Sequence, residues 1–120
     1  MSVAKLLYVF EHAPYSTSVG QETLDAAFIG AAFEQPVSVL FIHDGVFQLK
    51  SEQDTRSSDI KQYTKAFAAL ADFGIEHVYV HDLSLKARGL ELDHLQIDVQ
   101  LLDSDGIRSL ISEQKRVFTF

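Results

Sequence analysis

Two His-Asp pairs are the residues of this sequence whose types and spacing are best suited to chemistry. His43-Asp44 follows one apolar run and His81-Asp82 follows another. If the two runs are neighbouring parallel strands, their carboxyl ends meet at one sheet edge and the pairs lie together. Two imidazoles and two carboxylates in one place could bind a metal ion or act as a general-base dyad. A second interpretation stays open, because His and Asp are also common in turns at strand ends and no HExxH-like spacing supports a metal.

The other residue types that carry chemistry form weaker patterns. The loop after the first apolar run, EHAPYSTSVGQE, has one glycine and lacks the Gly-rich patterns that cradle phosphate. Ser16, Thr17 and Ser18 could bind an anion at a helix start, or could be plain turn and cap residues. The sequence has no G-x-S-x-G for a serine nucleophile. It also has no cysteine, so the chain has no thiol nucleophile, disulfide or thiolate metal ligand.

Length, composition and charge indicate one acidic globular domain spanning residues 1–120. A chain of 120 residues can bury its own core, and a hydrophobic content of 47 % is ordinary. Seventeen acidic residues against ten basic ones give a net charge of −7, which disfavours direct nucleic-acid binding. The apolar stretch LLYVF is too short for a signal peptide, and no run approaches the ~20 residues that span a bilayer. We therefore expect a cytoplasmic protein without membrane contact.

Apolar runs that alternate with helical patterns predict an α/β fold. Strands are expected at residues 5–10, 37–42, 77–80, 97–102 and 117–120. Helices are expected at residues 21–33, about 59–73 and 104–114, with a loop at 43–58 and a helical turn at 84–88. Ser18 and Gln21 fit a capping box, Gly74 can end the second helix, and Ser104 can cap the last one. This alternation predicts a three-layer α/β/α domain with a mostly parallel five-stranded sheet, whose partners and ligands bind at the carboxyl ends of the strands.

Two apolar segments fall where a polar surface is expected. The segment DGVFQL follows the second strand, although loops at strand ends are normally polar. The first helix carries a second apolar stripe beside its core stripe, and a helix that is apolar all round is covered on both sides. We predict that both segments contact another subunit, and the loop could instead fill its own core or hold a ligand. The residues of this predicted interface are Asp44, Gly45, Val46, Phe47, Gln48, Leu49, Ala26, Ile29, Gly30 and Phe33.

Several stretches taken together resemble the TusC/DsrF family of DsrE-like proteins. They are HAPYSTSVGQETLDAAF, FIHDGVFQL, SLKARGL and the terminal RVFTF, in this order, and the resemblance covers essentially the whole chain. The most specific of them is DGVFQL at residues 44–49. The resemblance implies a DsrE-like α/β/α domain, in agreement with the pattern of strands and helices.

The same resemblance implies a role in sulfur relay. Such a chain looks like one of three homologous subunits, beside TusB-like and TusD-like chains, in a cytoplasmic 2:2:2 heterohexamer. That sulfurtransferase complex relays persulfide sulfur from a TusA-like carrier to a TusE-like carrier, toward 2-thiouridine at the tRNA wobble position. DsrF-like relatives belong to a sulfur-oxidation complex, which is the alternative pathway, and of the two the resemblance favours tRNA thiolation.

The resemblance also singles out His81. In a TusD-like sister the sulfur-carrying cysteine stands eight residues before the Gly of an Arg-Gly pair, and counting back from Gly89 after Arg88 reaches His81. Imidazole cannot form a persulfide. The resemblance therefore implies a subunit without catalytic residue, metal or cofactor of its own. The competing interpretations are a small ligand-binding α/β enzyme that uses the two His-Asp pairs, and a homo-oligomeric scaffold.

Overall fold

A computed structural model describes residues 5–13, 19–33, 35–50 and 63–120 of the chain. Its strands are β1 (Leu6–Phe10), β2 (Val37–Phe41), β3 (His77–His81), β4 (Gln100–Leu102) and β5 (Arg116–Thr119). They form one sheet in the order β4-β3-β2-β1-β5, and every neighbouring pair is parallel. The predicted α/β fold with a five-stranded sheet is confirmed, and the described sheet is parallel throughout.

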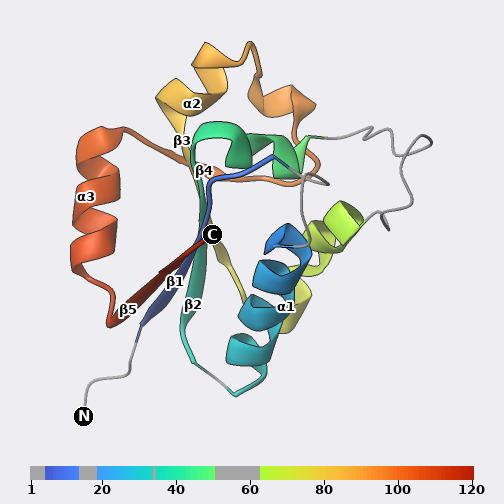
Figure 1. The fold of residues 1–120 in the computed structure, drawn as a ribbon, viewed down its shortest axis with the longest axis vertical. Coiled ribbons are helices and arrows are strands. Elements are labelled where there is room, and N and C mark those ends of the chain that lie inside the picture. The colour runs from blue at the N-terminus through green and yellow to red at the C-terminus, as the bar shows by residue number, and fades with distance from the viewer. Residues whose placement is uncertain (1–4, 14–18, 34, 51–62) are drawn as a thin grey trace.

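Helices cover both faces of this sheet (Figure 1). The α-helices are α1 (Val19–Ala32), α2 (Asp82–Ala87) and α3 (Ser104–Ser112). The 3₁₀ helices are η1 (His43–Leu49), η2 (Tyr63–Ala69), η3 (Ala71–Phe73) and η4 (Leu92–His94). α1 and η2 lie on one face, α3 lies on the other, and η1 and α2 lie at the carboxyl ends of β2 and β3. No helix in the described part of the chain is long and apolar enough to cross a membrane.

The main core lies between the sheet and α1, and aromatic rings form its centre. Phe10 and Phe41 stack with their ring centroids 4.9 Å apart, and Phe67 of η2 meets Phe10 edge-on at 5.5 Å. Each of these buried rings contributes up to about 3 kcal/mol to folding. A smaller cluster lies under α3 and includes Leu7 and Leu110. Both clusters exist because successive residues of a strand point to opposite faces of the sheet.

The segment between β2 and β3 differs from its predicted form. The predicted loop at 43–58 begins with η1, and the helix predicted at about 59–73 consists of η2 and η3 over its described part. Gly74 ends this segment as predicted. It adopts a left-handed φ of 85°, and its N–H donates to the carbonyl of Ala71.

The cap of α3 is a correction to the sequence-based expectation. Asp103, and not Ser104, is the N-cap, because the Asp103 carboxylate accepts a hydrogen bond of 2.7 Å from the N–H of Gly106. This frees the Ser104 hydroxyl for a different contact, described below. The predicted capping box of α1 involves Ser18, which lies outside the described residues.

Candidate functional site at the carboxyl edge of the sheet

The two His-Asp pairs meet at the carboxyl edge of the sheet. β2 and β3 are parallel neighbours with Phe41 opposite Val80, so His43 and His81 leave the sheet side by side. Both histidines line a small hollow of about 150 Å³. Its described lining is Ile42, His43, His81, Ser104 and Ile107. The juxtaposition expected from parallel strands is thus present.

His81 is held by two serine hydroxyls. Its Nδ1 lies 2.8 Å from Oγ of Ser84, and its Nε2 lies 3.1 Å from Oγ of Ser104. The buried Ser84 Oγ also accepts a hydrogen bond of 2.9 Å from the backbone N–H of His43. A neutral imidazole with its hydrogen on Nε2 satisfies this arrangement, because Ser84 can then donate to Nδ1 while accepting from His43. The network joins the ends of β2 and β3 to the start of α3.

The two carboxylates are directed to other partners. Oδ1 of Asp44 accepts a hydrogen bond of 2.8 Å from Nε of Arg88, and Nη1 of Arg88 donates to the Ser84 carbonyl at 3.1 Å. Oδ1 of Asp82 accepts from the N–H of Leu83 and lies 4.0 Å from Nε2 of His81, beyond hydrogen-bond distance.

This arrangement lacks the geometry of the chemistry first considered for the pairs. Neither carboxylate orients an imidazole, as a general-base dyad would require. The described residues contain no group of three or more His, Asp or Glu side chains placed to hold a metal ion. What the edge contains is a hydrogen-bonded junction that fixes the strand ends.

The DGVFQL segment packs back onto its own domain as η1. Val46 and Leu49 are buried in the main core, and Gln48 is buried with its Nε2 donating to the His12 carbonyl at 3.0 Å. Gly45 lies against the end of β1, where an added Cβ would overlap the carbonyl group of Phe10. Only glycine fits at that position.

The start of η1 is a strained turn. His43 has a left-handed φ of 51°, which residues other than glycine adopt rarely. The hydrogen bond from its N–H to Ser84 holds it in place. Of the six interface residues predicted in this segment, Asp44 is exposed and Phe47 is half-buried, whereas the other four lie inside. The loop therefore fills its own core, which was one of the interpretations left open by the sequence.

The second predicted interface, on α1, also contains some residues that face the core and others that face outward. Gly30 faces the sheet, where an added Cβ would come within 3.3 Å of Val37, and Ala26 packs against the main core. Ile29 and Phe33 point outward, with 59 % and 75 % of their surface exposed. Small residues let α1 approach the sheet closely, and the two large residues are left on the outside.

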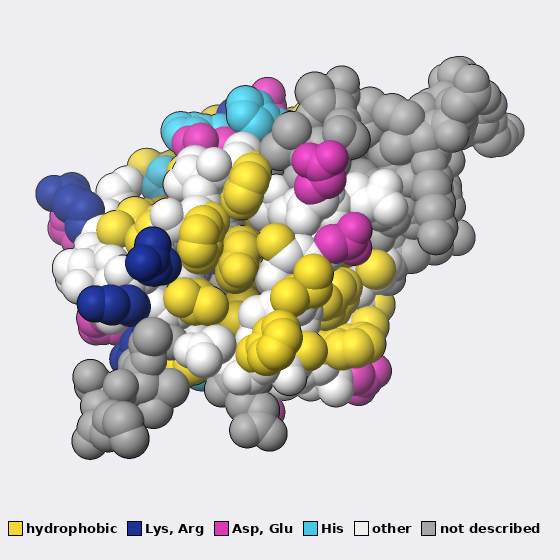
Figure 2. Space-filling view, turned by 60° about the horizontal axis from the view of Figure 1, so that its bottom comes forward, with side chains coloured by type: hydrophobic (Ala, Val, Ile, Leu, Met, Phe, Trp, Pro, Cys, Tyr) yellow, Lys and Arg dark blue, Asp and Glu magenta, His cyan; other side chains and the backbone are white. Residues whose placement is uncertain are grey.

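Further apolar side chains lie on and just after the edge strand β5. Phe118 stacks on Tyr8 of β1 with ring centroids 5.0 Å apart, and Phe120 is 36 % exposed. Figure 2 shows hydrophobic side chains gathered over the face on which α1 and β5 lie, with few charged side chains among them. We refer to Ile29, Phe33, Phe118 and Phe120 as the α1–β5 face.

Comparison with known proteins identifies the relatives of this chain. A family model described as DsrE/DsrF-like matches residues 4–120. The chain belongs to the DsrE/DsrF-like family. It is 37 % identical to an intracellular sulfur oxidation protein, DsrF, of Allochromatium vinosum, over 98 % of this chain and 97 % of that protein. It is also 37 % identical to a TusC homolog of Vibrio vulnificus, over 98 % of this chain and all of that protein.

Solved structures support the DsrE-like fold. The YchN protein of E. coli superposes with a TM-score of 0.84 at 17 % identity, over 98 % of this chain and all of that one. A protein of unknown function from Methanobacterium thermoautotrophicum gives a TM-score of 0.66 at 14 % identity, over 99 % of this chain. At these identities the likeness concerns the fold alone.

Three site residues were not predicted from the sequence: Ser84, Ser104 and Arg88. A signal existed for Ser84, because it stands three residues after His81 at the start of a helix, a spacing that returns the side chain to the first turn. Ser104 and Arg88 reach the site through tertiary contacts with β3 and η1, which leave no local pattern.

Proposed function

We propose that this chain is a cysteine-free, non-catalytic subunit of a sulfur-relay complex, a sulfurtransferase assembly whose other chains carry the sulfur. One observation carries the proposal: the chain is similar over nearly its full length to proteins named TusC and DsrF, yet contains no thiol. A persulfide requires a cysteine sulfur, so the chain contributes something other than the sulfur-carrying group.

The carboxyl edge supports a structural role. His81, at the position that corresponds to a sulfur-carrying cysteine in a TusD-like sister, has both ring nitrogens engaged by serine hydroxyls. Its neighbouring carboxylates have partners of their own within the chain. A side chain held in this way fixes the shape of the strand ends. In this proposal, the junction keeps the surface of the carboxyl edge in one shape within the relay complex.

The α1–β5 face supplies the means of assembly. Exposed phenylalanine and isoleucine side chains that adjoin an edge strand are typical of a protein–protein interface. We propose that TusB-like and TusD-like homologues cover this face in a cytoplasmic 2:2:2 heterohexamer. TusA-like and TusE-like carriers would deliver and receive sulfur through the complex. The surface part of η1, Asp44 and Phe47, is a second contact region in this proposal.

For the pathway, we propose 2-thiolation of the tRNA wobble uridine. The second candidate is sulfur oxidation, because the chain is as similar to the DsrF protein of Allochromatium vinosum as to the TusC homolog of Vibrio vulnificus. In both pathways the subunit acts through its assembly. The sulfur chemistry that differs between them takes place on other chains.

The test is to recover the tagged chain from its native host, measure the mass of the intact complex and sequence its components. The proposal expects two homologous partners in equal copies, at least one with a cysteine. Deletion of this chain should then lower 2-thiouridine in tRNA and leave oxidation of reduced sulfur unchanged, and the reverse pattern would select the second pathway. A chain recovered alone, as a monomer or homo-oligomer, would refute the subunit role.

A further inference from the structure

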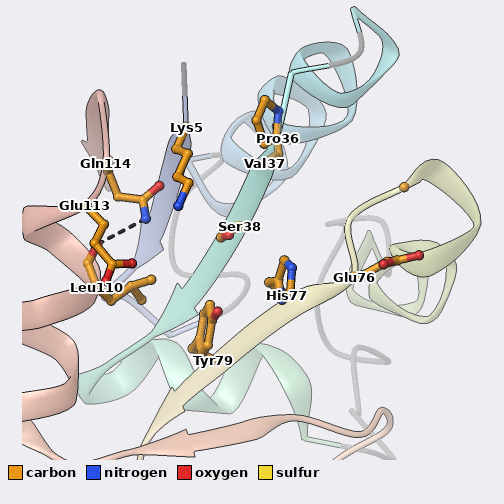
Figure 3. A pocket seen from close by; sticks show the side chains of 11 residues that line it. Lys5, Pro36, Val37, Ser38, Glu76, His77, Tyr79, Leu110, Glu113 and Gln114 are labelled. Atoms are coloured by element: carbon orange, nitrogen blue, oxygen red, sulfur yellow. Dashed lines mark hydrogen bonds between the residues drawn. The ribbon is translucent and has the colours of Figure 1, made fainter. Parts of the chain in front are cut away.

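A larger cavity lies at the opposite end of the sheet from the histidine junction. It has a volume of about 400 Å³ and sits on the α3 side, at the amino ends of β2 and β3 (Figure 3). Lys5, Glu113 and Gln114 lie on one side of it, and Ser38, His77 and Tyr79 lie on the other. Cavities of this size with a few convergent polar groups are typical small-molecule sites.

Gln114 has an unused acceptor at this cavity. Its Oε1 atom is buried, and none of the residues that the structure describes donates a hydrogen bond to it. Its Nε2 donates to the Leu110 carbonyl at 3.0 Å, which fixes the orientation of the amide and directs the oxygen away from that carbonyl. A buried acceptor without a partner carries an energetic cost. An N–H donor of a ligand would remove that cost.

Charged groups of both signs stand beside this acceptor. Lys5 precedes β1 and Glu113 follows α3, and Figure 3 shows both side chains at the same wall of the cavity as Gln114. Neither makes an ion pair within the described residues. An ammonium and a carboxylate that are close but unpaired can each bind the opposite charge of one ligand.

The far wall is formed by β3 and β2. His77 and Tyr79 point to the same face, with their rings nearly parallel at 9° and their centroids 6.2 Å apart. Ser38 stands opposite His77 in the strand register. These groups offer a ring surface and hydroxyls. Glu76 also lines this side of the cavity, and Figure 3 shows its side chain directed away from Lys5 and Gln114, so the charged end of a ligand belongs at the Lys5 wall.

We propose that this cavity binds a small zwitterion of the amino-acid class. The ligand's ammonium group would donate to Gln114 Oε1 and face the Glu113 carboxylate, and its carboxylate would face Lys5. Its remaining atoms would lie along His77 and Tyr79. This site is separate from the carboxyl edge and from the α1–β5 face. The binding proposal therefore does not depend on the sulfur-relay role.

The test uses the chain in the assembly in which it purifies. Each protein amino acid is added in turn at millimolar concentration, and binding is detected by saturation-transfer NMR and then titrated. The best binder is compared with its N-acetyl and its methyl ester derivatives, which remove the ammonium and the carboxylate charge. Two variants remove the protein's groups, Lys5→Met and Gln114→Leu. Lys86→Met, an exposed lysine on α2, is the matched control.

We expect saturable binding that weakens about tenfold to a hundredfold in Lys5→Met and in Gln114→Leu, and that is unchanged in Lys86→Met. Both derivatives should bind more weakly than the parent amino acid by a similar factor. Absence of saturable binding by every amino acid would overturn the proposal. So would equal affinity in Lys5→Met, a variant whose exposed position leaves the fold intact, or equal affinity of the N-acetyl derivative.

Discussion

The carboxyl edge of the sheet and the α1–β5 face differ in how far the chain satisfies its own groups. At the carboxyl edge, the imidazole of His81, the hydroxyl of Ser84 and the carboxylate of Asp44 each have a partner within the chain. On the α1–β5 face, Ile29 and Phe33 are largely exposed.

The two regions use their side chains in opposite ways. At the carboxyl edge, polar side chains that could do chemistry form hydrogen bonds within the chain. On the α1–β5 face, large apolar side chains that are normally buried are exposed to solvent. An enzyme that used the carboxyl edge would show the opposite distribution there, with free polar groups in the crevice between the strand ends. The difference therefore favours the proposed role within an assembly.

The largest expected effect is at the carboxyl edge, from Gly45→Ala. The added Cβ would overlap the Phe10 carbonyl group at the end of β1, and neither backbone can move freely. We expect a loss of more than about 3 kcal/mol in the free energy of unfolding, measured by guanidinium denaturation. Gly74→Ala is the matched control. It has open space around it and a positive φ, so the loss should be about 1 kcal/mol.

Two truncations compare the two predicted interfaces directly. Leu49→Ala in η1 should cost about 2–5 kcal/mol in the unfolding free energy of the chain, because Leu49 is fully buried. Phe33→Ala on the α1–β5 face should cost less than about 0.5 kcal/mol, because the ring is exposed. Equal losses for the two variants would mean that the regions do not differ as described.

Ser84→Ala should have an intermediate effect. It removes the acceptor of the His43 N–H and one partner of the His81 imidazole, and the site is buried. We expect a loss of about 1–3 kcal/mol and a shift of the His81 ring resonances in NMR spectra. Ser112→Ala at the exposed end of α3 is the control, with an expected change below about 0.5 kcal/mol. Equal unfolding free energies for the two serine variants would mean that the junction does not stabilise the fold.

The smallest expected effect concerns Tyr8, which lies beneath Phe118. Burial raises the pKa of its phenol above the ordinary value of 10.0. As the pH rises past 10.0, the unfolded chain loses this proton first, so the folded state loses stability up to the raised pKa. Tyr8→Phe should flatten the alkaline fall in unfolding free energy that begins near the ordinary phenol pKa of 10.0. An equally steep fall in the variant would show that Tyr8 is not its source.

The arrangement of strands was predictable because the apolar runs of the sequence are short and well separated. The runs before His43 and His81 mark β2 and β3, and their parallel pairing follows from the helices between strands. Boundaries were less predictable. β4 begins at Gln100, later than the predicted residue 97, because the residues before it pack against the core in a non-strand conformation.

The chemistry of the site was less predictable than its location. The sequence shows that Val46, Phe47 and Leu49 are apolar, but it does not show whether they turn inward or outward. The answer depends on how closely Gly45 approaches Phe10 in three dimensions. The partner of Asp44 is likewise Arg88, a residue 44 positions away. Contacts of this kind arise from the register of distant strands and helices.

The most direct test of the account is the mass of the intact complex, measured by native mass spectrometry for variants of the two regions. Ile29→Asp combined with Phe33→Asp should release this subunit from its partners, because two charges would be buried in an apolar interface. His81→Ala, at the carboxyl edge, should leave the complex assembled. A complex that survives the double substitution and dissociates on His81→Ala would contradict the assignment of assembly to the α1–β5 face.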